Sequence, residues 1–248
     1  SIKDKISEEK LKELTSKAID KMSNDYSIND LLKNIKDNIS VKKLEELASK
    51  AIDKMSDDDK IKDLLNDIKD KISQKKLEEL ASIAIDKISK NNNIIDLLKN
   101  IKDNISEEIL DELAYRAINK ISDNYNEFIS LLENIKDNIS QKKLEELAAI
   151  AIDKISIDLS IKTLLENIKD KLSQKKLEEL AIIAIDKIPN YLITALITVI
   201  KNNISKQILD ELASRAIDKI SDIYKFKLLL ESIKDKISEE KLKELTSK

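Results

Sequence analysis

Several residue types are missing from the 248-residue sequence: it has no cysteine, histidine, glycine or tryptophan, and Pro189 is its only proline. Without cysteine and histidine there are no disulfides, no thiolate nucleophiles, no imidazole bases and none of the usual zinc or haem ligands. Without glycine, tight turns that need a left-handed backbone conformation are disfavoured, and so are strands joined by such turns. The sequence therefore predicts no metal site and no cofactor, and it argues against a β fold.

An excess of one charge is also lacking, because 45 basic and 48 acidic residues nearly cancel and are interspersed along the chain. The net charge of −3 indicates neither a polyanion-binding protein nor an acidic tail. The most apolar stretch, residues 191–200, has about half of the roughly 20 residues that a membrane span needs. We expect no membrane span, and the composition assigns no cellular compartment.

What the sequence has instead is a recurring phrase, Ile-Lys-Asp or Ile-Lys-Asn, at intervals of 32 to 34 residues. A fixed period of this length is typical of a solenoid, whose units are each too small to bury their own apolar face. The sequence thus predicts a single repeat array over residues 1–248. Its predicted repeats are residues 2–34, 35–67, 68–100, 101–134, 135–167, 168–199 and 200–232, followed by a half repeat, 233–248.

Each repeat carries two apolar stripes with the spacing of a helix face, in the first repeat from Leu11 to Met22 and from Ile28 onward. The stripes are out of phase, so one continuous helix would scatter its apolar side chains around its circumference. We therefore expect a helical hairpin, with a first helix of about 15 residues and a second of about 12. The predicted fold class is all-α, an α-solenoid (superhelix) of about seven 33-residue helix-turn-helix repeats plus a final half repeat.

Two columns of small residues support this interpretation. A serine before each first helix is expected to be its N-cap, because a hydroxyl can accept a hydrogen bond from the first turn. An alanine within each first helix would let neighbouring helices approach closely. The serines are Ser7, Ser40, Ser73, Ser106, Ser140, Ser173 and Ser205. The alanines are Ala18, Ala51, Ala84, Ala117, Ala151, Ala184 and Ala216.

Over its whole length the chain resembles α-solenoids of helical hairpins, such as HEAT, armadillo and tetratricopeptide proteins. Residues 44–55, LEELASKAIDKM, resemble many helices of the HEAT type. The tetratricopeptide pattern of Trp, Gly and closing Pro is missing, as is the ankyrin Thr-Pro-Leu-His, so the resemblance is to the class alone. It implies binding of proteins, peptides or nucleic acids.

A lysine column raises the possibility of nucleic-acid binding, since evenly spaced cations can follow a phosphate backbone. Each of these lysines follows an acidic or amide residue, which favours locally neutralised, solvated side chains, and the only arginines are Arg116 and Arg215. We therefore expect nucleic acid to be an unlikely partner. The column consists of Lys21, Lys54, Lys87, Lys120, Lys154, Lys187 and Lys219.

Few aromatic residues are present, and they fall into two groups. Phe128 and Phe226 share an apolar column and are expected in the core. Most tyrosines fall in the segment between the two helices, which is also the most variable part of each repeat. Tyrosine is common at binding hot spots, although unconstrained drift of exposed loops explains the variation equally well. The candidate partner-binding residues are Tyr26, Tyr125, Tyr191, Tyr224 and Leu192.

The two ends of the chain carry the same sequence: residues 1–17 and 232–248 are identical, at an offset of 231 residues, or seven times 33. Adjacent repeats have diverged further, so we interpret the chain as one segment of a longer array; an engineered duplicate cap is the competing interpretation. The absence of an initiator Met also suggests a piece of something longer.

No constellation of catalytic residues is present, because adjacent carboxylates such as Glu145 and Glu146 point apart on a helix. The leading hypothesis is a non-enzymatic structural or scaffold segment of a long repetitive protein, which forms a fibre by self-association or binds a protein partner through its variable inter-helix edge. The alternatives are a modular nucleic-acid-binding solenoid and a discrete adaptor for one partner protein. No small-molecule substrate is indicated.

Overall fold

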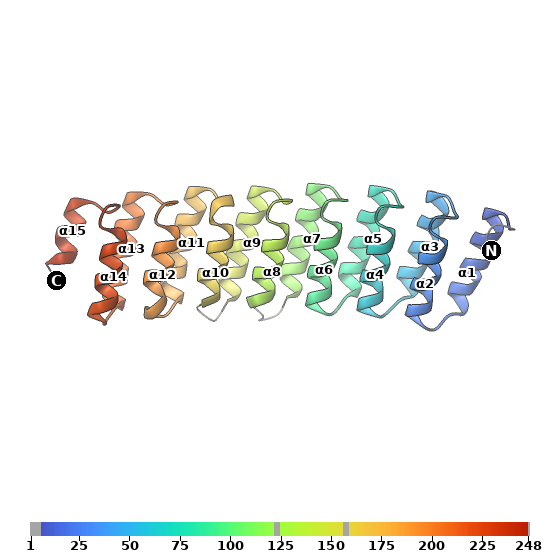
Figure 1. Cartoon of the computed structure of the whole chain (residues 1–248), viewed down its shortest axis with the longest axis horizontal. Helices are drawn as coiled ribbons and strands as arrows, with labels where there is room; N and C mark the ends of the chain where they lie inside the picture. Colours follow the sequence, from blue (N-terminus) through green and yellow to red (C-terminus); the bar gives the residue numbers. More distant parts are fainter. Residues whose placement is uncertain (1–5, 122–124, 156–158, 248) are drawn as a thin grey trace. The chain divides into compact units, whose positions relative to one another are not determined.

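The computed structural model describes residues 6–121, 125–155 and 159–247. Within these ranges the chain forms fifteen α-helices and one short 3₁₀ helix, η2 (Lys169–Lys171), and no strand (Figure 1). The helices are α1 (Glu8–Lys21), α2 (Asp25–Ile35), α3 (Val41–Lys54), α4 (Asp58–Ile68), α5 (Gln74–Lys87), α6 (Asn91–Ile101), α7 (Glu107–Lys120), α8 (Tyr125–Ile135), α9 (Gln141–Lys154), α10 (Leu159–Ile168), α11 (Gln174–Lys187), α12 (Asn190–Ile200), α13 (Lys206–Lys219), α14 (Ile223–Ile233) and α15 (Glu239–Thr246).

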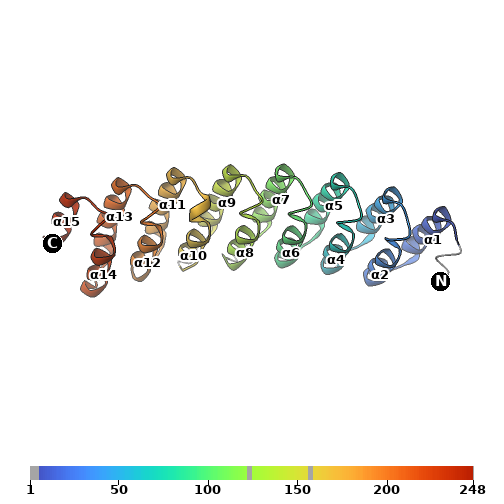
Figure 2. The same ribbon diagram turned by 45° about the horizontal axis from the view of Figure 1, so that its top comes forward.

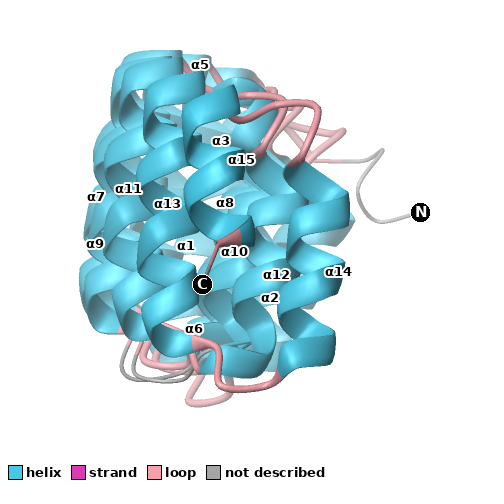
Figure 3. Cartoon of the chain, turned by 90° about the vertical axis from the view of Figure 1, so that its left-hand side faces the viewer, coloured by secondary structure: helices cyan, strands magenta, loops and turns pink. Residues whose placement is uncertain are grey.

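The helices belong to two compact units: Ser1–Lys120 with Asp137–Ile139, and Ile121–Lys136 with Ser140–Lys248. In the first unit α1, α3, α5 and α7 contact one another in succession, and so do α2, α4 and α6. In the second unit α8, α10, α12 and α14 form one such layer, and α9, α11, α13 and α15 form the other. Figure 2 shows the two layers of each unit, and Figure 3 shows that the connecting segments lie at the ends of the helices.

These observations confirm the predicted fold, because each unit is a stack of helical hairpins, an all-α solenoid. Most first helices have 14 residues and most second helices 11, close to the expected lengths. The expected repeat boundaries, and their union in one array, stay predictions. The serine caps are confirmed for six repeats: Ser7, Ser73, Ser106, Ser140, Ser173 and Ser205 accept a hydrogen bond from an amide in the first turn.

The apolar stripes and the alanine column form the core. Every alanine of that column except Ala18 is fully buried, as is Phe128. The prediction for Phe226 is wrong in part, because this ring is only half-buried. No second helix follows α14 within the described residues, so one side of the Phe226 ring lacks the cover that the equivalent side chains receive elsewhere.

The lysine column is not a solvated ladder, and that expectation is wrong. The ammonium groups of five of its lysines donate to carbonyl oxygens at the C-terminal end of the preceding first helix. Lys87, for example, contacts the carbonyl oxygens of Ile52 and Asp53 at 2.6 and 2.8 Å. These carbonyls have no partner within their own helix, and a cation beside them also interacts favourably with the helix dipole. The same contact is made by Lys54, Lys120, Lys187 and Lys219.

A column of carboxylates on the first helices also joins neighbouring repeats. Glu78 accepts a hydrogen bond from the backbone amide of Ser106, the N-cap of the next first helix, at 2.8 Å. Burial raises the pKa of Glu78, but hydrogen bonds from Gln74 and Ser106 outweigh it and hold the pKa below its ordinary value. The same bond links Glu45 to Ser73, Glu145 to Ser173, Glu178 to Ser205 and Asp210 to Ser238.

Removing one of the lysine caps gives a first test of this framework. Lys87→Met keeps the aliphatic stem but leaves two carbonyl oxygens without their partner, so we expect a loss of about 1–2 kcal/mol in the free energy of unfolding. Lys21→Met is the matched control, because no helix precedes α1 among the described residues and the Lys21 ammonium makes no contact there. Urea unfolding followed by circular dichroism measures both, and equal losses would contradict the capping role.

Candidate protein-binding edge

The structure places the tyrosines on helices, which corrects the expectation that they lie in loops. Tyr26, Tyr191 and Tyr224 are the second residues of α2, α12 and α14, and Tyr125 is the first residue of α8. The second helices thus begin earlier than expected. Their N-caps vary in residue type, which made the start hard to predict; in α2, α12 and α14 they are Asn24, Pro189 and Asp222.

Local capping fixes where two of these tyrosines point. The Asn24 side-chain oxygen accepts a hydrogen bond from the Tyr26 amide, and Asp222 accepts one from the Tyr224 amide, both at 2.8 Å. A capped first turn is held in helical conformation, so the tyrosine side chain is presented from a rigid element.

Exposure separates the five sequence-predicted residues. Tyr26, Tyr191 and Tyr224 are between 57% and 67% exposed, and Tyr125 is half-buried. Leu192 is only 8% exposed, because it faces the core of the second unit next to the exposed Tyr191. It is therefore not part of the exposed surface. Tyr191 and Tyr224 lie on α12 and α14, which contact each other, whereas Tyr26 lies in the other unit.

In the second unit the exposed tyrosines are joined by aliphatic side chains that the sequence did not single out. Leu159 begins α10 and Ile223 begins α14, and both are more than half exposed. Leu159 shares the column of Tyr26, which was the available signal. Because α10 contacts α12 and α12 contacts α14, these side chains follow the starts of three neighbouring helices. We call the set the apolar edge; it consists of Leu159, Tyr191, Ile223, Tyr224 and Leu228.

Two lysines lie beside the apolar edge. Lys225 and Lys227 lie on the first turns of α14, and neither ammonium group has an acidic partner within the part of the chain that the structure describes. The nearby carboxylate of Asp222 is taken up as an N-cap acceptor for Tyr224 and Lys225. The edge therefore has two lysine ammonium groups beside its apolar side chains.

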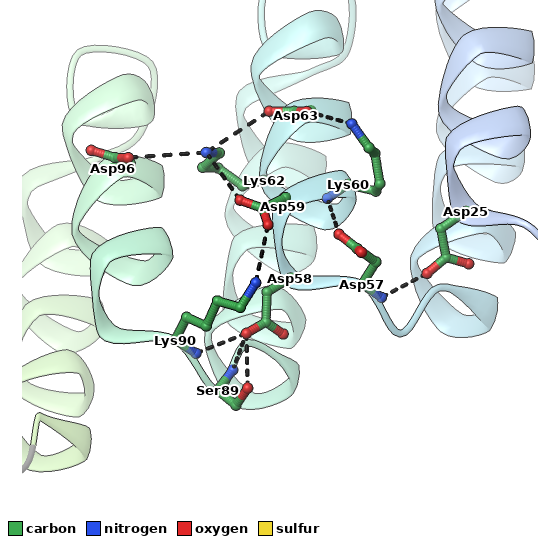
Figure 4. Close-up of polar contacts among 10 residues, drawn as sticks. All are labelled: Asp25, Asp57, Asp58, Asp59, Lys60, Lys62, Asp63, Ser89, Lys90 and Asp96. Carbon is green, nitrogen blue, oxygen red and sulfur yellow. Dashed lines mark hydrogen bonds and ion pairs between the residues drawn. The ribbon is translucent and has the colours of Figure 1, made fainter.

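The corresponding edge of the first unit is acidic and internally satisfied, as Figure 4 shows. The Asp25 carboxylate accepts hydrogen bonds from the backbone amides of Ser56 and Asp57, at 2.7 and 2.6 Å. Asp58 accepts three, from the Ser89 amide, the Ser89 hydroxyl and the Lys90 amide, at 2.8–3.0 Å. These carboxylates hold the next repeat in place, so this edge is part of the framework.

The ring of Tyr26 contacts a lysine of its own unit. The Lys60 ammonium lies over its ring, 5.3 Å from the centroid, a distance at which a cation is attracted to an aromatic face. The ring also borders a cavity of about 320 Å³ between α2 and α4, whose remaining lining, including Asp30, Lys33 and Asp63, is entirely polar. Tyr26 is thus engaged within its own unit and makes a natural comparison for Tyr191 and Tyr224.

No other chemistry is apparent in the described ranges. They contain no group of three or more acidic side chains arranged to hold a metal ion. None of the helices described combines the length and apolar character needed to cross a membrane.

The stacked hairpins and the contacts that repeat at the period of the sequence define the class of this protein, an α-helical repeat solenoid. No protein-family model and no curated protein matches the chain, so the class is as far as the assignment goes.

Among solved structures, the chain is similar to PUF-8, determined in complex with PBE-RNA, at 12% identity over 95% of this chain and 82% of that one, with a TM-score of 0.35. It is also similar to a computationally designed self-assembling cyclic homo-oligomer, at 14% identity over 97% and 94% of the two chains, with a TM-score of 0.18. A third similar structure is the designed helical repeat protein DHR64, at 17% identity over 97% and 92%, with a TM-score of 0.17. None of these similarities enters the argument about fold or function.

Proposed function

We propose that this protein is a non-enzymatic scaffold that binds a partner protein through the apolar edge of its second unit. The partner is a protein segment that carries acidic residues together with large apolar side chains. The observation that supports this most directly is the row of exposed side chains along α10, α12 and α14, of which Leu159, Tyr191, Ile223 and Tyr224 are 57–73% exposed.

Two properties of the edge support a protein partner of this kind. Tyrosines that stand on capped helices lose little conformational entropy on binding, and tyrosine is common among residues that dominate binding energy. The unpaired ammonium groups of Lys225 and Lys227 complement acidic groups, which steers association and makes it sensitive to salt.

Nucleic acid remains an alternative outcome of the test and not part of the proposal. In most repeats the lysine column that suggested it is engaged with carbonyl oxygens, as Lys54, Lys87, Lys120, Lys187 and Lys219 show. These ammonium groups would have to leave their helix-capping positions to contact phosphates.

A peptide-library selection against the full chain tests the proposal. Libraries with acidic, basic or neutral backgrounds and random Leu, Phe, Tyr or Trp positions are the probes, and we expect enrichment from the acidic library. For a selected peptide, Tyr191→Ala and Tyr224→Ala should each weaken binding by about tenfold or more, whereas Tyr26→Ala, the matched control in the first unit, should leave it unchanged.

Two results would overturn the proposal. Equal weakening by Tyr26→Ala would show that the bound surface is not the apolar edge. Enrichment from the basic or neutral library alone would reject an acidic partner. Low-salt binding of single-stranded RNA or DNA that is lost in Lys225→Ala and Lys227→Ala would instead assign the edge to nucleic acid.

A further inference from the structure

The duplicated sequence occupies two different environments. Residues 1–17 and 232–248 are identical, and they include the first part of α1 and all of α15. Leu14 and Leu245 are equivalent positions in this duplicate, yet Leu14 is 46% exposed and Leu245 only 1%. The same sequence is thus docked in the C-terminal repeat and open on one side in the N-terminal repeat.

The docked copy, α15, is held on α13 by apolar and polar contacts. The Ser238 amide donates to Asp210 at 3.0 Å, and the Lys241 ammonium donates to the Ser214 hydroxyl at 2.7 Å. The duplicate places Ser7 and Lys10 at the positions of Ser238 and Lys241. Helix α1 of a second molecule therefore carries every side chain that α15 uses to dock.

Helix α15 ends at Thr246, whereas α1 continues for six residues beyond the equivalent position. A cavity of about 210 Å³ lies at the end of α13 and the start of α14, lined in part by Ile217, Ile220 and Phe226. Ile217 and Phe226 are half-buried, although the equivalent side chains of the other repeats are almost fully buried.

The N-terminal repeat has complementary groups open to solvent. Ala18 and Met22 of the α1 segment and Leu31 of α2 are half-buried, whereas their equivalents in the following repeat, Ala51, Met55 and Leu64, are at most 1% exposed. In interior repeats these columns are covered by the preceding hairpin, so a hairpin placed before α1 would bury them.

The lysine column gives a polar argument for the same pairing. The last lysine of the column, Lys219, caps the carbonyl oxygens of Ile185 and Asp186 on the preceding first helix. The carbonyl oxygens at the C-terminal end of α13 hold the equivalent position, but no lysine contacts them within the described residues. At the other end of the column, the Lys21 ammonium contacts no carbonyl oxygen within the described residues. A second molecule that follows α13 would bring Lys21 to those carbonyls.

We propose that two copies of this chain associate head to tail: the α1–α2 hairpin of one copy docks on α13 and α14 of the other and displaces α15. Helix α15 is then a built-in competitor that blocks the site in the isolated molecule. Because the two surfaces are different, each added copy leaves a new site open, and growth does not close on itself unless the geometry forms a ring. This inference does not rest on the proposed function, although Ile223 of the apolar edge also lines the cavity at the end of α13 and the start of α14.

Sedimentation velocity over a range of concentrations tests the proposal. Leu245→Asp should release α15 and lower the concentration at which half of the molecules are associated by roughly tenfold or more, because it places a charge at a buried position. Adding Leu14→Glu to this variant should abolish association. Adding Leu159→Glu, an exposed leucine at neither docking surface, should leave it unchanged.

A mixing experiment tests the head-to-tail arrangement. In the Leu14→Glu/Leu245→Asp chain, α1 cannot dock but the α13–α14 site is free. In a Phe226→Glu chain, the α13–α14 site is blocked but α1 is unchanged. Each should be monomeric alone, and an equimolar mixture should stop at dimers. If Leu245→Asp stays monomeric at every concentration while its circular dichroism shows folded helices, or if Leu14→Glu does not reduce its association, the proposal is overturned.

Discussion

Phe128→Ala is expected to lower the free energy of unfolding by about 3–5 kcal/mol, the usual cost of removing a fully buried phenylalanine ring. Phe128 lies on α8 and its ring is fully buried, so the alanine would leave a cavity that the surrounding helices of the second unit cannot close without moving. Phe226→Ala is the matched control, because Phe226 occupies the same column of the repeat but is only half-buried. Phe226→Ala should lose less than half as much free energy of unfolding as Phe128→Ala.

Urea unfolding of both variants, followed by circular dichroism, measures the two losses against the unmutated chain. If the two variants lost equal free energy of unfolding, the open side of α14 would have to be covered in solution. That result would also bear on association, since a second copy docked on α14 would bury Phe226. The comparison is therefore made at concentrations where sedimentation shows a monomer.

The helical hairpins were predictable from sequence because their cause is local. Two apolar stripes of helical spacing, a serine before each first helix and a fixed period are all visible along a single repeat, and no knowledge of the stack is needed to interpret them. The same holds for the burial of Phe128, since its column is apolar in every repeat.

The contacts between repeats were not predictable in this way. The residue beside Lys87 in sequence is Asp86, and that proximity suggested neutralisation of the ammonium group. The actual partners, Ile52 and Asp53, lie 35 and 34 residues earlier in the chain. Backbone carbonyls are present in every residue, so nothing in the sequence distinguishes the two that Lys87 reaches. Those two are determined by how neighbouring first helices are aligned along each other in the stack.

The residues of the candidate site could also be predicted only in part. Tyr191 and Leu192 were predicted together because they fall in one variable segment, yet successive residues on a helix point in directions about 100° apart. Once α12 begins at Asn190, one of the two must face the core. Because the N-caps of the second helices vary in residue type, the first residues of these helices could not be predicted. The column of tyrosines was visible in the sequence, but the neighbours that share its exposed face were not.

Asp58→Ala is expected to lower the free energy of unfolding by about 2–4 kcal/mol, because two backbone amides, those of Ser89 and Lys90, would lose their acceptor in a partly buried setting. Asp58 is itself 7% exposed and lies where the second and third repeats meet. Asp59→Ala is the matched control. Its carboxylate pairs with the Lys90 side chain at 3.1 Å on the surface, and such exposed ion pairs contribute about 0–1 kcal/mol.

The pH dependence of this loss identifies its cause. Burial raises the pKa of Asp58, but the hydrogen bonds from Lys90 and Ser89 outweigh burial and hold the pKa below its ordinary value of 3.8. A lowered pKa in the folded state means that the stabilisation is complete above pH 3.8 and is lost as the pH falls through the folded-state pKa. The difference in urea midpoint between the unmutated chain and Asp58→Ala should therefore shrink from about pH 7 to about pH 3. Other carboxylates with lowered pKa values, such as Glu78 and Glu178, weaken both proteins in acid alike, so the difference isolates Asp58. A difference that does not change with pH would mean that the aspartate side chain stabilises the repeat junction by packing and not as an ionised acceptor.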